Sequence, residues 1–300
     1  MKKRKLKKEV KLAIGVFMAI LLIFVGVMIS TSIYDEDMDS SNSQETTQEN
    51  HIGEESSSGD IASIPNSIND SETLKYVQEF QKRAKKDSRY NEVIRNSAEY
   101  PKDILRLLYS NEETLDFVLS KSEMRVPNFF IKVDEECGDG VIPRLQQWDP
   151  KWGWFEYGNN VLAINGCGPT ALSMVVSGLT GNDRITPIKI AKYSDRAGFH
   201  EVAGTNWNLM TEGAKKYGVK GWAVDNTKSS FESALKNGNP IICSVGPGYF
   251  TSEGHFIVIA GMKDGKLVIH DPNSISRSEK LWNYNDIKGQ IKAAWAYSLK

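Results

Sequence analysis

Hydrophobic positions are unevenly distributed along this chain, and the first block of them is continuous. Residues 12–33 form the uncharged stretch LAIGVFMAILLIFVGVMISTSI, and residues 1–11 before it are rich in Lys and Arg. About 20 apolar residues are enough to cross the hydrocarbon core of a bilayer. Because basic flanks stay in the cytoplasm, the pattern predicts a single-pass signal anchor in the cell membrane, with the rest of the chain extracellular. A cleaved signal peptide is the alternative, although its apolar core is normally shorter.

The segment after this stretch has the opposite character. Residues 34–70 are rich in Ser, Asn, Asp and Glu and contain few large apolar side chains. A segment of this composition cannot bury enough surface to fold, so we expect a flexible polar linker. Such a linker would hold the remainder of the chain away from the membrane.

Helical spacing begins after the predicted linker. Apolar residues recur every three or four positions in three runs within residues 71–125. Ser71, Pro101 and Asn111 stand at the starts of these runs, where capping side chains and proline are favoured. The pattern predicts a small helical stem without a catalytic motif. We expect this stem to pack on the domain that follows it, and binding of a protein partner is the alternative.

The remaining residues, 126–300, change from helical to strand character. Apolar residues have helical spacing after Cys167 and within residues 187–193 and 207–217. After Pro240 the apolar runs are typical of strands, at residues 241–245, 255–260 and 266–270. Helices followed by an antiparallel sheet indicate an α+β fold, and the span has the size of one catalytic domain.

Charge and cysteine content exclude several functions. The formal net charge is -1, so the chain has no bulk electrostatic attraction for nucleic acid. Its 3 cysteines, Cys137, Cys167 and Cys243, lack the spacing of a zinc site, and we expect neither metal nor cofactor. An odd number of cysteines in an exported protein leaves at least one thiol free. Cys137 and Cys243 can form a disulfide, or all the thiols can stay free.

Cys167 is the candidate nucleophile. It stands between Gly166 and Gly168 and is followed by Pro169, a residue that suits the first turn of a helix. The thiol would then lie at the positive end of the helix dipole, where a thiolate is stabilised. The alternative is a buried structural cysteine at a tight turn, but such a cysteine does not require two flanking glycines.

A cysteine nucleophile needs a base, usually histidine, and a group that orients this base. The chain offers four histidines. His51 lies in the predicted linker and His200 in a predicted loop, so neither is supported as the base. His255 begins a predicted strand, and His270 ends the next strand, directly before Asp271.

The connection between these two strands determines whether His255 and Asp271 can meet. A three-residue loop with Gly265 at positive φ would place both residues on one face of the sheet. A two-residue turn at Asp264–Gly265 would shift the register and place them on opposite faces. His270 must point away from Asp271, because neighbouring residues of a strand alternate between faces.

Four segments, in this order, resemble the C39-like branch of papain-type, bacteriocin-processing-like cysteine peptidases. They span about residues 141–295 and read Gln147-Trp148-Asp149-Pro150-Lys151-Trp152, Gly166-Cys167-Gly168-Pro169-Thr170-Ala171, Gly254-His255-Phe256-Ile257-Val258 and His270-Asp271-Pro272-Asn273. One such segment would be weak support, whereas four in the family's order are specific. The resemblance implies a papain-like peptidase fold for residues 126–300.

The resemblance also implies roles for individual residues. Cys167 corresponds to the nucleophile, His255 to the general base and Asp271 to the group that orients the imidazole. Gln147 corresponds by position to the glutamine that stabilises the oxyanion. The adjacent Gln146 is the alternative for this last role. The separation between Gln147 and Cys167 is longer than in papain-type enzymes in which both residues lie in one short segment.

The substrate cleft is defined less sharply than the reactive residues. The candidate substrate-binding residues are glycines beside the reactive groups, which permit close approach of a peptide backbone, and exposed aromatic side chains: Gly166, Gly168, Gly254, Tyr249 and Trp207. Trp152 and Trp154 are further candidates for the cleft wall, although core packing is the ordinary role of tryptophan.

The sequence therefore predicts a membrane-anchored extracellular cysteine peptidase that hydrolyses the peptide bonds of a peptide or protein substrate. A cell-wall peptide amidase or endopeptidase is one alternative, and a non-catalytic peptide-binding protein with the same fold is the other. The sequence contains no transporter or nucleotide-binding region, so we do not expect leader-peptide processing for an exporter.

Overall fold

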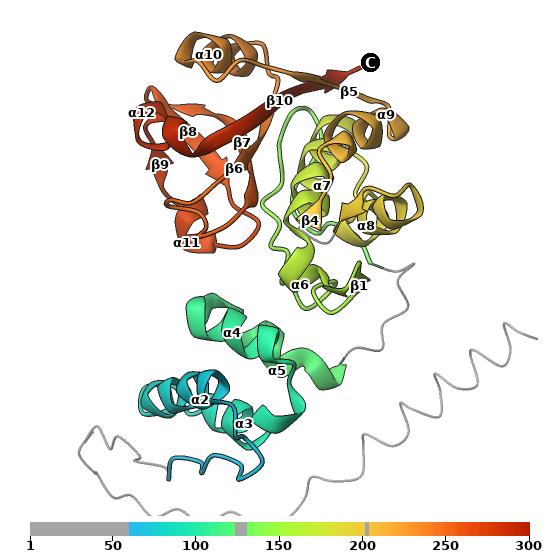
Figure 1. Cartoon of the computed structure of the whole chain (residues 1–300). Helices are drawn as coiled ribbons and strands as arrows, with labels where there is room; N and C mark the ends of the chain where they lie inside the picture. The colour runs from blue at the N-terminus through green and yellow to red at the C-terminus, as the bar shows by residue number, and fades with distance from the viewer. Residues whose placement is uncertain (1–59, 124–130, 202–203) are drawn as a thin grey trace, which may run out of the picture. The chain divides into compact units, whose positions relative to one another are not determined.

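The computed structural model describes residues 60–123, 131–201 and 204–300 (Figure 1). Within these ranges, the structure contains no helix that is both long and apolar enough to cross a membrane. The predicted basic tip (1–11), the predicted anchor (12–33) and His51 lie outside the described residues. The stem and the domain after it belong to one compact unit of the chain.

The predicted stem is helical. It contains α2 (Ser71–Ala84), α3 (Tyr90–Arg95), α4 (Lys102–Ser110) and α5 (Leu115–Leu119), with 3-10 turns at Ser97–Glu99, Glu112–Thr114 and Ser120–Glu123. The cap of α2 is Asp70, one residue before the predicted Ser71, and its carboxylate accepts the Thr73 N–H at 2.9 Å. Asn111 caps the last part of the stem as predicted, accepting the Glu113 N–H at 3.1 Å. The helix α3 is short, and its apolar spacing was not recognised in the sequence.

The predicted linker is too long at its C-terminal end. Residues 60–70 were assigned to it, but Ala62 is buried in the apolar core of the stem and Ile64 packs against that core. The Ala62 N–H donates to Asn91 Oδ1 at 2.8 Å, and the Ala62 carbonyl accepts from Gln81 at 2.9 Å. These contacts tie the segment to α2 and α3, which the polar composition of residues 34–70 concealed. Residues 34–59 lie outside the described ranges.

The domain after the stem opens with little regular structure and then forms its helices. They are α6 (Leu162–Asn165), α7 (Cys167–Thr180), α8 (Pro187–Arg196), a π-helical turn (Leu209–Gly213) that continues into α9 (Ala214–Lys216), α10 (Lys228–Lys236), α11 (Ile275–Ser278), and α12 (Tyr284–Ile287) with the 3-10 turn Lys288–Gln290. Two short antiparallel strand pairs lie among them, β1 (Glu156–Tyr157) with β2 (Asn160–Val161) and β3 (His200–Glu201) with β4 (Gly204–Thr205).

A six-stranded antiparallel sheet completes the domain, in the order β5-β10-β6-β7-β8-β9 (Figure 1). Its strands are β5 (Val219–Ala223), β6 (Ile241–Val245), β7 (His255–Lys263), β8 (Lys266–His270), β9 (Leu281–Trp282) and β10 (Ile291–Leu299). The three predicted strands are β6, β7 and β8, so the predicted α+β class and antiparallel sheet are confirmed. The long strand β10, which inserts between β5 and β6, was not predicted.

The sheet is buried on both faces, which is why its central strands read as continuous apolar runs. Ile242, Val258 and Trp295 belong to the core that includes the buried face of α7. Ile241 and Ile257, which alternate with them, belong to a second core that includes Phe231 and Tyr284. The helix α7 is therefore packed directly on the sheet that carries His255, and this packing sets the position of its first residue, Cys167.

Candidate active site

Cys167 is the first residue of α7, where the sequence predicted it. The short helix α6 ends at Gly166, whose N–H donates to the Leu162 carbonyl at 2.7 Å. The Thr170 N–H then donates to the Gly166 carbonyl at 2.9 Å and starts α7. Every residue from Gly168 to Gly178 is buried. The thiol is therefore carried by a helix that is fixed along most of its length.

The two glycines beside the thiol have a packing role. A Cβ atom on Gly166 would lie 2.3 Å from the Leu162 carbonyl oxygen, and one on Gly168 would lie 2.7 Å from Thr205 Oγ1. Both distances are shorter than van der Waals contact allows. Close packing therefore accounts for these glycines, and their predicted contact with substrate stays a prediction. Gly254 differs, because a Cβ atom there would meet no atom within 4 Å.

His255 and Asp271 meet as the candidate roles require. His255 is the first residue of β7, and its Nε2 lies 2.8 Å from Asp271 Oδ1. His255 is 7% exposed and Asp271 is 0% exposed. Water is thus almost excluded from the pair, which strengthens the electrostatic interaction between the two side chains.

The turn between β7 and β8 has two residues, whereas the predicted geometry required a loop of three. Lys263 pairs with Lys266, so Asp264–Gly265 is a two-residue turn, with φ values of 52° and 73°. That turn alone would place His255 and Asp271 on opposite faces. A β-bulge between Ile259 and Gly261 inserts one extra residue into β7 and shifts the register back.

The consequence of the bulge can be read from the pairing beyond it. Val258 pairs with His270, and continuing this register places Asp271 opposite Ile257. Ile257 and His255 are two positions apart, so their side chains lie on one face of the sheet. The predicted juxtaposition of His255 and Asp271 is present, but two compensating irregularities produce it.

The Asp271 carboxylate is held by more groups than the sequence indicated. Oδ1 also accepts the Asn273 N–H at 2.8 Å, and Oδ2 accepts from Arg277 Nε at 2.6 Å. The Asp271 N–H donates to Ser278 Oγ at 2.8 Å. Burial alone would raise the pKa of Asp271, but His255 and Arg277 outweigh it and hold the pKa below its ordinary value. The carboxylate is therefore charged at neutral pH.

The charge state of His255 follows from its neighbours. Burial alone would lower the pKa of His255, but the Asp271 carboxylate and the hydrogen-bonded Cys167 outweigh it and raise the pKa to about 10. Asp271 occupies Nε2, which leaves Nδ1 for the thiol. The arrangement favours an imidazolium beside the Asp271 carboxylate, with Nδ1 free to serve the Cys167 side chain.

Gln147 lies beside this site but its amide is already engaged. Its Nε2 lies 2.8 Å from the Ala163 carbonyl oxygen and 3.3 Å from that of Ile164. Its N–H donates to the Pro272 carbonyl at 2.7 Å. Gln147 thus links α6 to the loop that carries Asp271, and oxyanion stabilisation by its side chain stays a prediction. Gln146 is also buried, and its Oε1 has no hydrogen-bond partner.

A family model described as the Peptidase_C39 like family matches residues 141–300. The chain belongs to this C39-like peptidase family. The match covers all four segments on which the sequence-based resemblance rests. It therefore confirms that resemblance and supports a cysteine peptidase type of function for the domain.

Two solved structures are similar to this C39-like chain. The first is the peptidase domain of Streptococcus ComA, a bi-functional ABC transporter of a quorum-sensing pathway, with 19% identity, a TM-score of 0.37, and coverage of 45% of this chain and 93% of that chain. The second is described as a C39-like peptidase from Bacillus anthracis, with 16% identity, a TM-score of 0.37, and coverage of 56% and 99%. Among curated proteins, none matches.

The other histidines of the C39-like domain lie in different surroundings. His270 Nδ1 lies 3.2 Å from the Pro143 carbonyl oxygen, and burial lowers its pKa to about 4. The His270 side chain points away from Asp271, toward the Pro143 carbonyl, as predicted from the alternation of strand residues between the two faces of the sheet. His200 packs edge-on against Tyr157, with ring centroids 5.0 Å apart, and its ring occupies the space above Gly158.

Two of the tryptophans considered for the cleft wall are core residues. Trp152 is buried in the core around α7, and Trp154 stacks on Phe117 of the stem with ring centroids 4.6 Å apart. Both assignments to the cleft are therefore wrong. Trp207 is 48% exposed and Tyr249 is 60% exposed, so these two aromatic side chains remain available to a ligand.

The thiols are free in the structure. Cys137, Cys167 and Cys243 form no disulfide, so the suggested pairing of Cys137 with Cys243 is absent. Cys243 is completely buried in β6, and burial raises the pKa of its thiol. Within the described residues, no cluster of three or more His, Cys, Asp or Glu side chains could hold a metal ion.

Proposed function

We propose that this protein is a cysteine peptidase in which Cys167, His255 and Asp271 form the catalytic triad. The observation that carries the proposal is the buried 2.8 Å contact between His255 and Asp271, with Cys167 close enough to raise the pKa of the same imidazole. Membership of the C39-like family supports the same chemistry. A structural cysteine would need neither the charged imidazole nor the buried carboxylate.

The proposed reaction is acyl transfer to the thiol followed by hydrolysis. The Cys167 thiolate attacks the carbonyl carbon of the scissile amide and forms a C–S bond. The developing oxyanion is stabilised by the Cys167 N–H, one of the first N–H groups of α7, which have no acceptor within the helix. The imidazolium of His255 protonates the leaving amine as the C–N bond breaks. Water, deprotonated by the neutral imidazole, then cleaves the thioester.

Asp271 keeps the imidazole in the required orientation throughout this cycle. Its bond to Nε2 directs Nδ1 toward the thiol, and its charge stabilises the imidazolium. Arg277 in turn fixes the second carboxylate oxygen. Among the three residues of the proposed triad, the Arg277 side chain bonds to Asp271 alone. We therefore assign Arg277 a positioning role rather than a catalytic one.

A labelling experiment tests the proposal directly. The full chain is treated at neutral pH with a peptide that carries a thiol-reactive electrophile, and the labelled residue is identified by mass spectrometry. We expect Cys167 to be labelled, and labelling to be lost in Cys167→Ala and strongly reduced in His255→Ala. Cys137→Ala is the matched control and should leave labelling unchanged. Equal labelling of the His255→Ala variant would contradict the triad.

The class of substrate requires a separate assay. The full chain is incubated in parallel with an unfolded protein and with purified peptidoglycan, and the products are identified by mass spectrometry. We propose that peptide bonds of a protein or peptide are cleaved. Products from peptidoglycan alone would assign the protein to cell-wall peptides, and binding without products, with Cys167 unlabelled, would indicate a non-catalytic peptide-binding protein.

We propose further that residues 12–33 anchor the peptidase domain outside the cell. The uncharged stretch and the basic residues before it support this orientation. A protease added to intact cells should degrade the domain while a cytoplasmic marker survives. Protection of the domain until the cells are broken would contradict the proposed location.

A further inference from the structure

The stem contacts the loop that carries Asp271. Asn111 Nδ2 donates to the Asn273 carbonyl at 2.7 Å, two residues after Asp271. The same carbonyl is the acceptor for the Trp148 indole N–H at 3.3 Å. Stem and peptidase domain therefore meet at the loop between β8 and α11.

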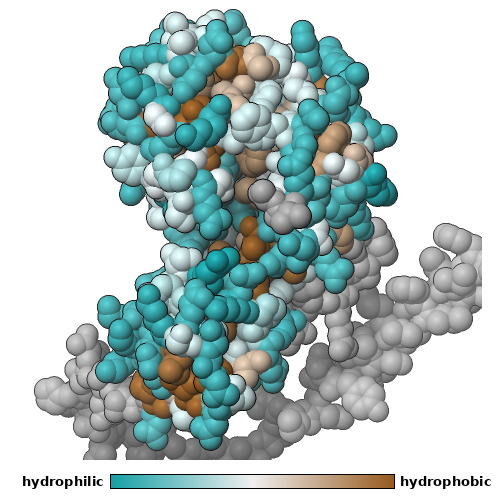
Figure 2. Space-filling view, in the orientation of Figure 1, coloured by the Kyte–Doolittle hydropathy of each residue, from teal (hydrophilic) through white to brown (hydrophobic). Residues whose placement is uncertain are grey.

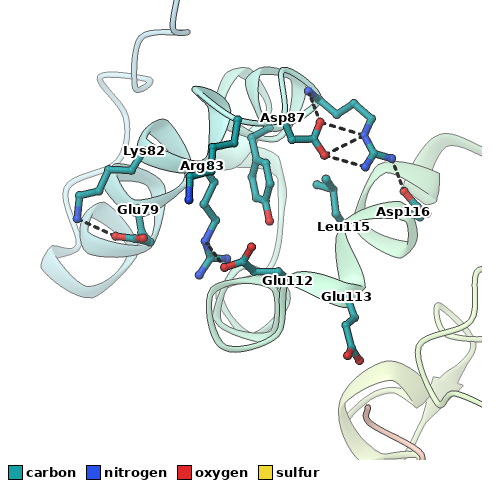
Figure 3. Close-up of a pocket in the computed structure, with 11 residues that line it drawn as sticks. Glu79, Lys82, Arg83, Asp87, Glu112, Glu113, Leu115 and Asp116 are labelled. Carbon is teal, nitrogen blue, oxygen red and sulfur yellow. Dashed lines mark hydrogen bonds and ion pairs between the residues drawn. The ribbon is translucent and has the colours of Figure 1, made fainter. Parts of the chain in front are cut away.

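Glu113 of the stem makes the strongest of these contacts. Its Oε2 accepts the Ile275 N–H at 2.7 Å, and its Oε1 accepts the Ser276 N–H at 2.9 Å. In Figure 3, Glu113 points away from the ion pairs of the neighbouring stem pocket, which join Arg83 to Glu112 and Arg89 to Asp116. Its carboxylate is thus directed to the peptidase domain and not to the charges of the stem.

The two N–H groups that Glu113 accepts are the first two of α11. The initial N–H groups of a helix have no acceptor inside the helix and need one from elsewhere. The helix α11 has 4 residues, too few to be stable on their own. Ser274 accepts the Arg277 N–H at 3.2 Å, so Ser274 and Glu113 together satisfy the start of this helix.

The helix that Glu113 caps is the one that holds Asp271. Arg277 and Ser278 lie on α11, and both bond to Asp271, one to the carboxylate and one to the backbone N–H. A displacement of α11 would therefore displace the donor on Oδ2 and loosen the carboxylate that orients His255. The connection runs from Glu113 by hydrogen bonds to the start of α11, along the backbone of this helix, and from Arg277 and Ser278 by hydrogen bonds to Asp271.

We propose that Glu113 and Asn111 of the stem are positioning residues of the peptidase site, Glu113 holding Asp271 in place through α11 and Asn111 through the loop at Asn273. This inference rests on the proposed function, because it assigns a role toward the same triad. The stem packs on the domain as predicted, and the proposal extends that role to a structural part of the active site. The face in Figure 2 is predominantly hydrophilic, with separate apolar areas.

The test compares Glu113→Ala with the adjacent control Glu112→Ala in the full chain. Glu112 is a suitable control because its side chain is 69% exposed and pairs with Arg83 within the stem. The alkylation rate of Cys167 by iodoacetamide is measured as a function of pH, in a Cys137→Ala background. Wild type should react at pH values well below the ordinary thiol pKa, because its thiolate is paired with His255.

In Glu113→Ala we expect the low-pH reactivity to shrink and kcat to fall, on the order of threefold to tenfold, the effect of removing one capping side chain. KM should stay unchanged, because Glu113 is not placed against the substrate. Glu113→Gln should restore part of the profile, since its amide oxygen can still accept a hydrogen bond. A merely structural role would lower the melting temperature and leave the pH profile unchanged.

The outcomes separate this inference from the proposed function. If Cys167 of the wild type does not react at low pH, or if this reactivity persists in His255→Ala, the triad itself is contradicted. If wild type has it and Glu113→Ala matches Glu112→Ala, the triad stands and the positioning role is overturned. If Glu113→Ala does not fold, Glu113→Gln against Glu112→Gln gives the same comparison, and identical pH profiles again overturn the role.

Discussion

The environments of His255 and His270 differ sharply although the two residues lie on neighbouring strands. His255 is bonded to the Asp271 carboxylate, which overcomes the effect of burial and raises its pKa to about 10. His270 is bonded to the neutral Pro143 carbonyl, and burial lowers its pKa to about 4. Both rings are largely removed from water. The largest contribution to the raised pKa of His255 comes from the Asp271 carboxylate, and His270 has no such carboxylate partner among the described residues.

This contrast explains why only one of the two histidines is suited to the proposed chemistry. A base that is charged at rest can stabilise a thiolate and later protonate the leaving amine. A histidine that stays neutral throughout the physiological range cannot form the resting ion pair. Both residues are histidines, so the placement of Asp271 beside His255 and not beside His270 separates their proposed roles.

The largest expected effect is on the rate of peptide hydrolysis, and it distinguishes His255 from His270. His255→Ala should reduce peptide hydrolysis by at least about 10³-fold, because the base and the ion pair are both lost. His270→Gln is the matched control and should retain hydrolysis within a few-fold, since an amide can still donate to the Pro143 carbonyl. The assay is initial-rate hydrolysis of a peptide that the wild type cleaves. A comparable loss in both variants would remove the basis for the contrast.

A smaller but more specific effect is expected from Asp271→Asn, which removes the charge and preserves the shape. Without the carboxylate, burial should dominate at His255 as it does at His270, so the pKa of His255 should fall. We expect hydrolysis to decrease on the order of 10²- to 10⁴-fold, the range that follows loss of an orienting carboxylate. Proton NMR titration of the His255 ring measures the pKa itself. An unchanged His255 pKa would show that Asp271 is not its controlling neighbour.

The sequence predicted the local half of this site well. The helix at Cys167 and the strands at β6, β7 and β8 are signalled by residues close in the chain, through apolar spacing and proline. Asp264–Gly265 is also a local signal for a two-residue turn, since both positions adopt positive φ. The sequence alone leaves both turns open, and only the longer loop would join His255 to Asp271 without a further irregularity.

The remainder of the site depends on contacts between distant residues. The β-bulge after Ile259 is specified by how two strands pair, and Gly261 beside it is its local signal, because an isolated glycine in a strand often marks a bulge. Arg277 lies six residues after Asp271 on a helix too short to produce a periodic pattern. Glu113 lies in a different part of the chain, where its acidic side chain resembled an ordinary helix-start residue. These features determine the geometry of Asp271 and could not be inferred from one segment alone.

The smallest expected effect concerns stability, and it has opposite signs at the two histidines. The pKa of His270 is lowered from 6.5 to about 4, so its neutral form contributes stability that is present above pH 6.5 and lost as the pH falls toward 4. This contribution is at most about 3 kcal/mol. The pKa of His255 is raised from 6.5 to about 10, so its charged form contributes stability that is present below pH 6.5 and lost as the pH rises toward 10.

Chemical unfolding of the two variants over this pH range measures the difference. His270→Gln should flatten the acid side of the stability profile, because the proton that the unfolded state takes up is no longer involved. His255→Gln should flatten the alkaline side, and on the acid side it should differ from the wild type only through Asp271, whose pKa His255 helps to lower. The background loss from protonation of the other carboxylates is shared by all three proteins and cancels in the comparison. If both variants flatten the same side, the two rings titrate alike, and the distinction between a charged His255 and a neutral His270 is lost.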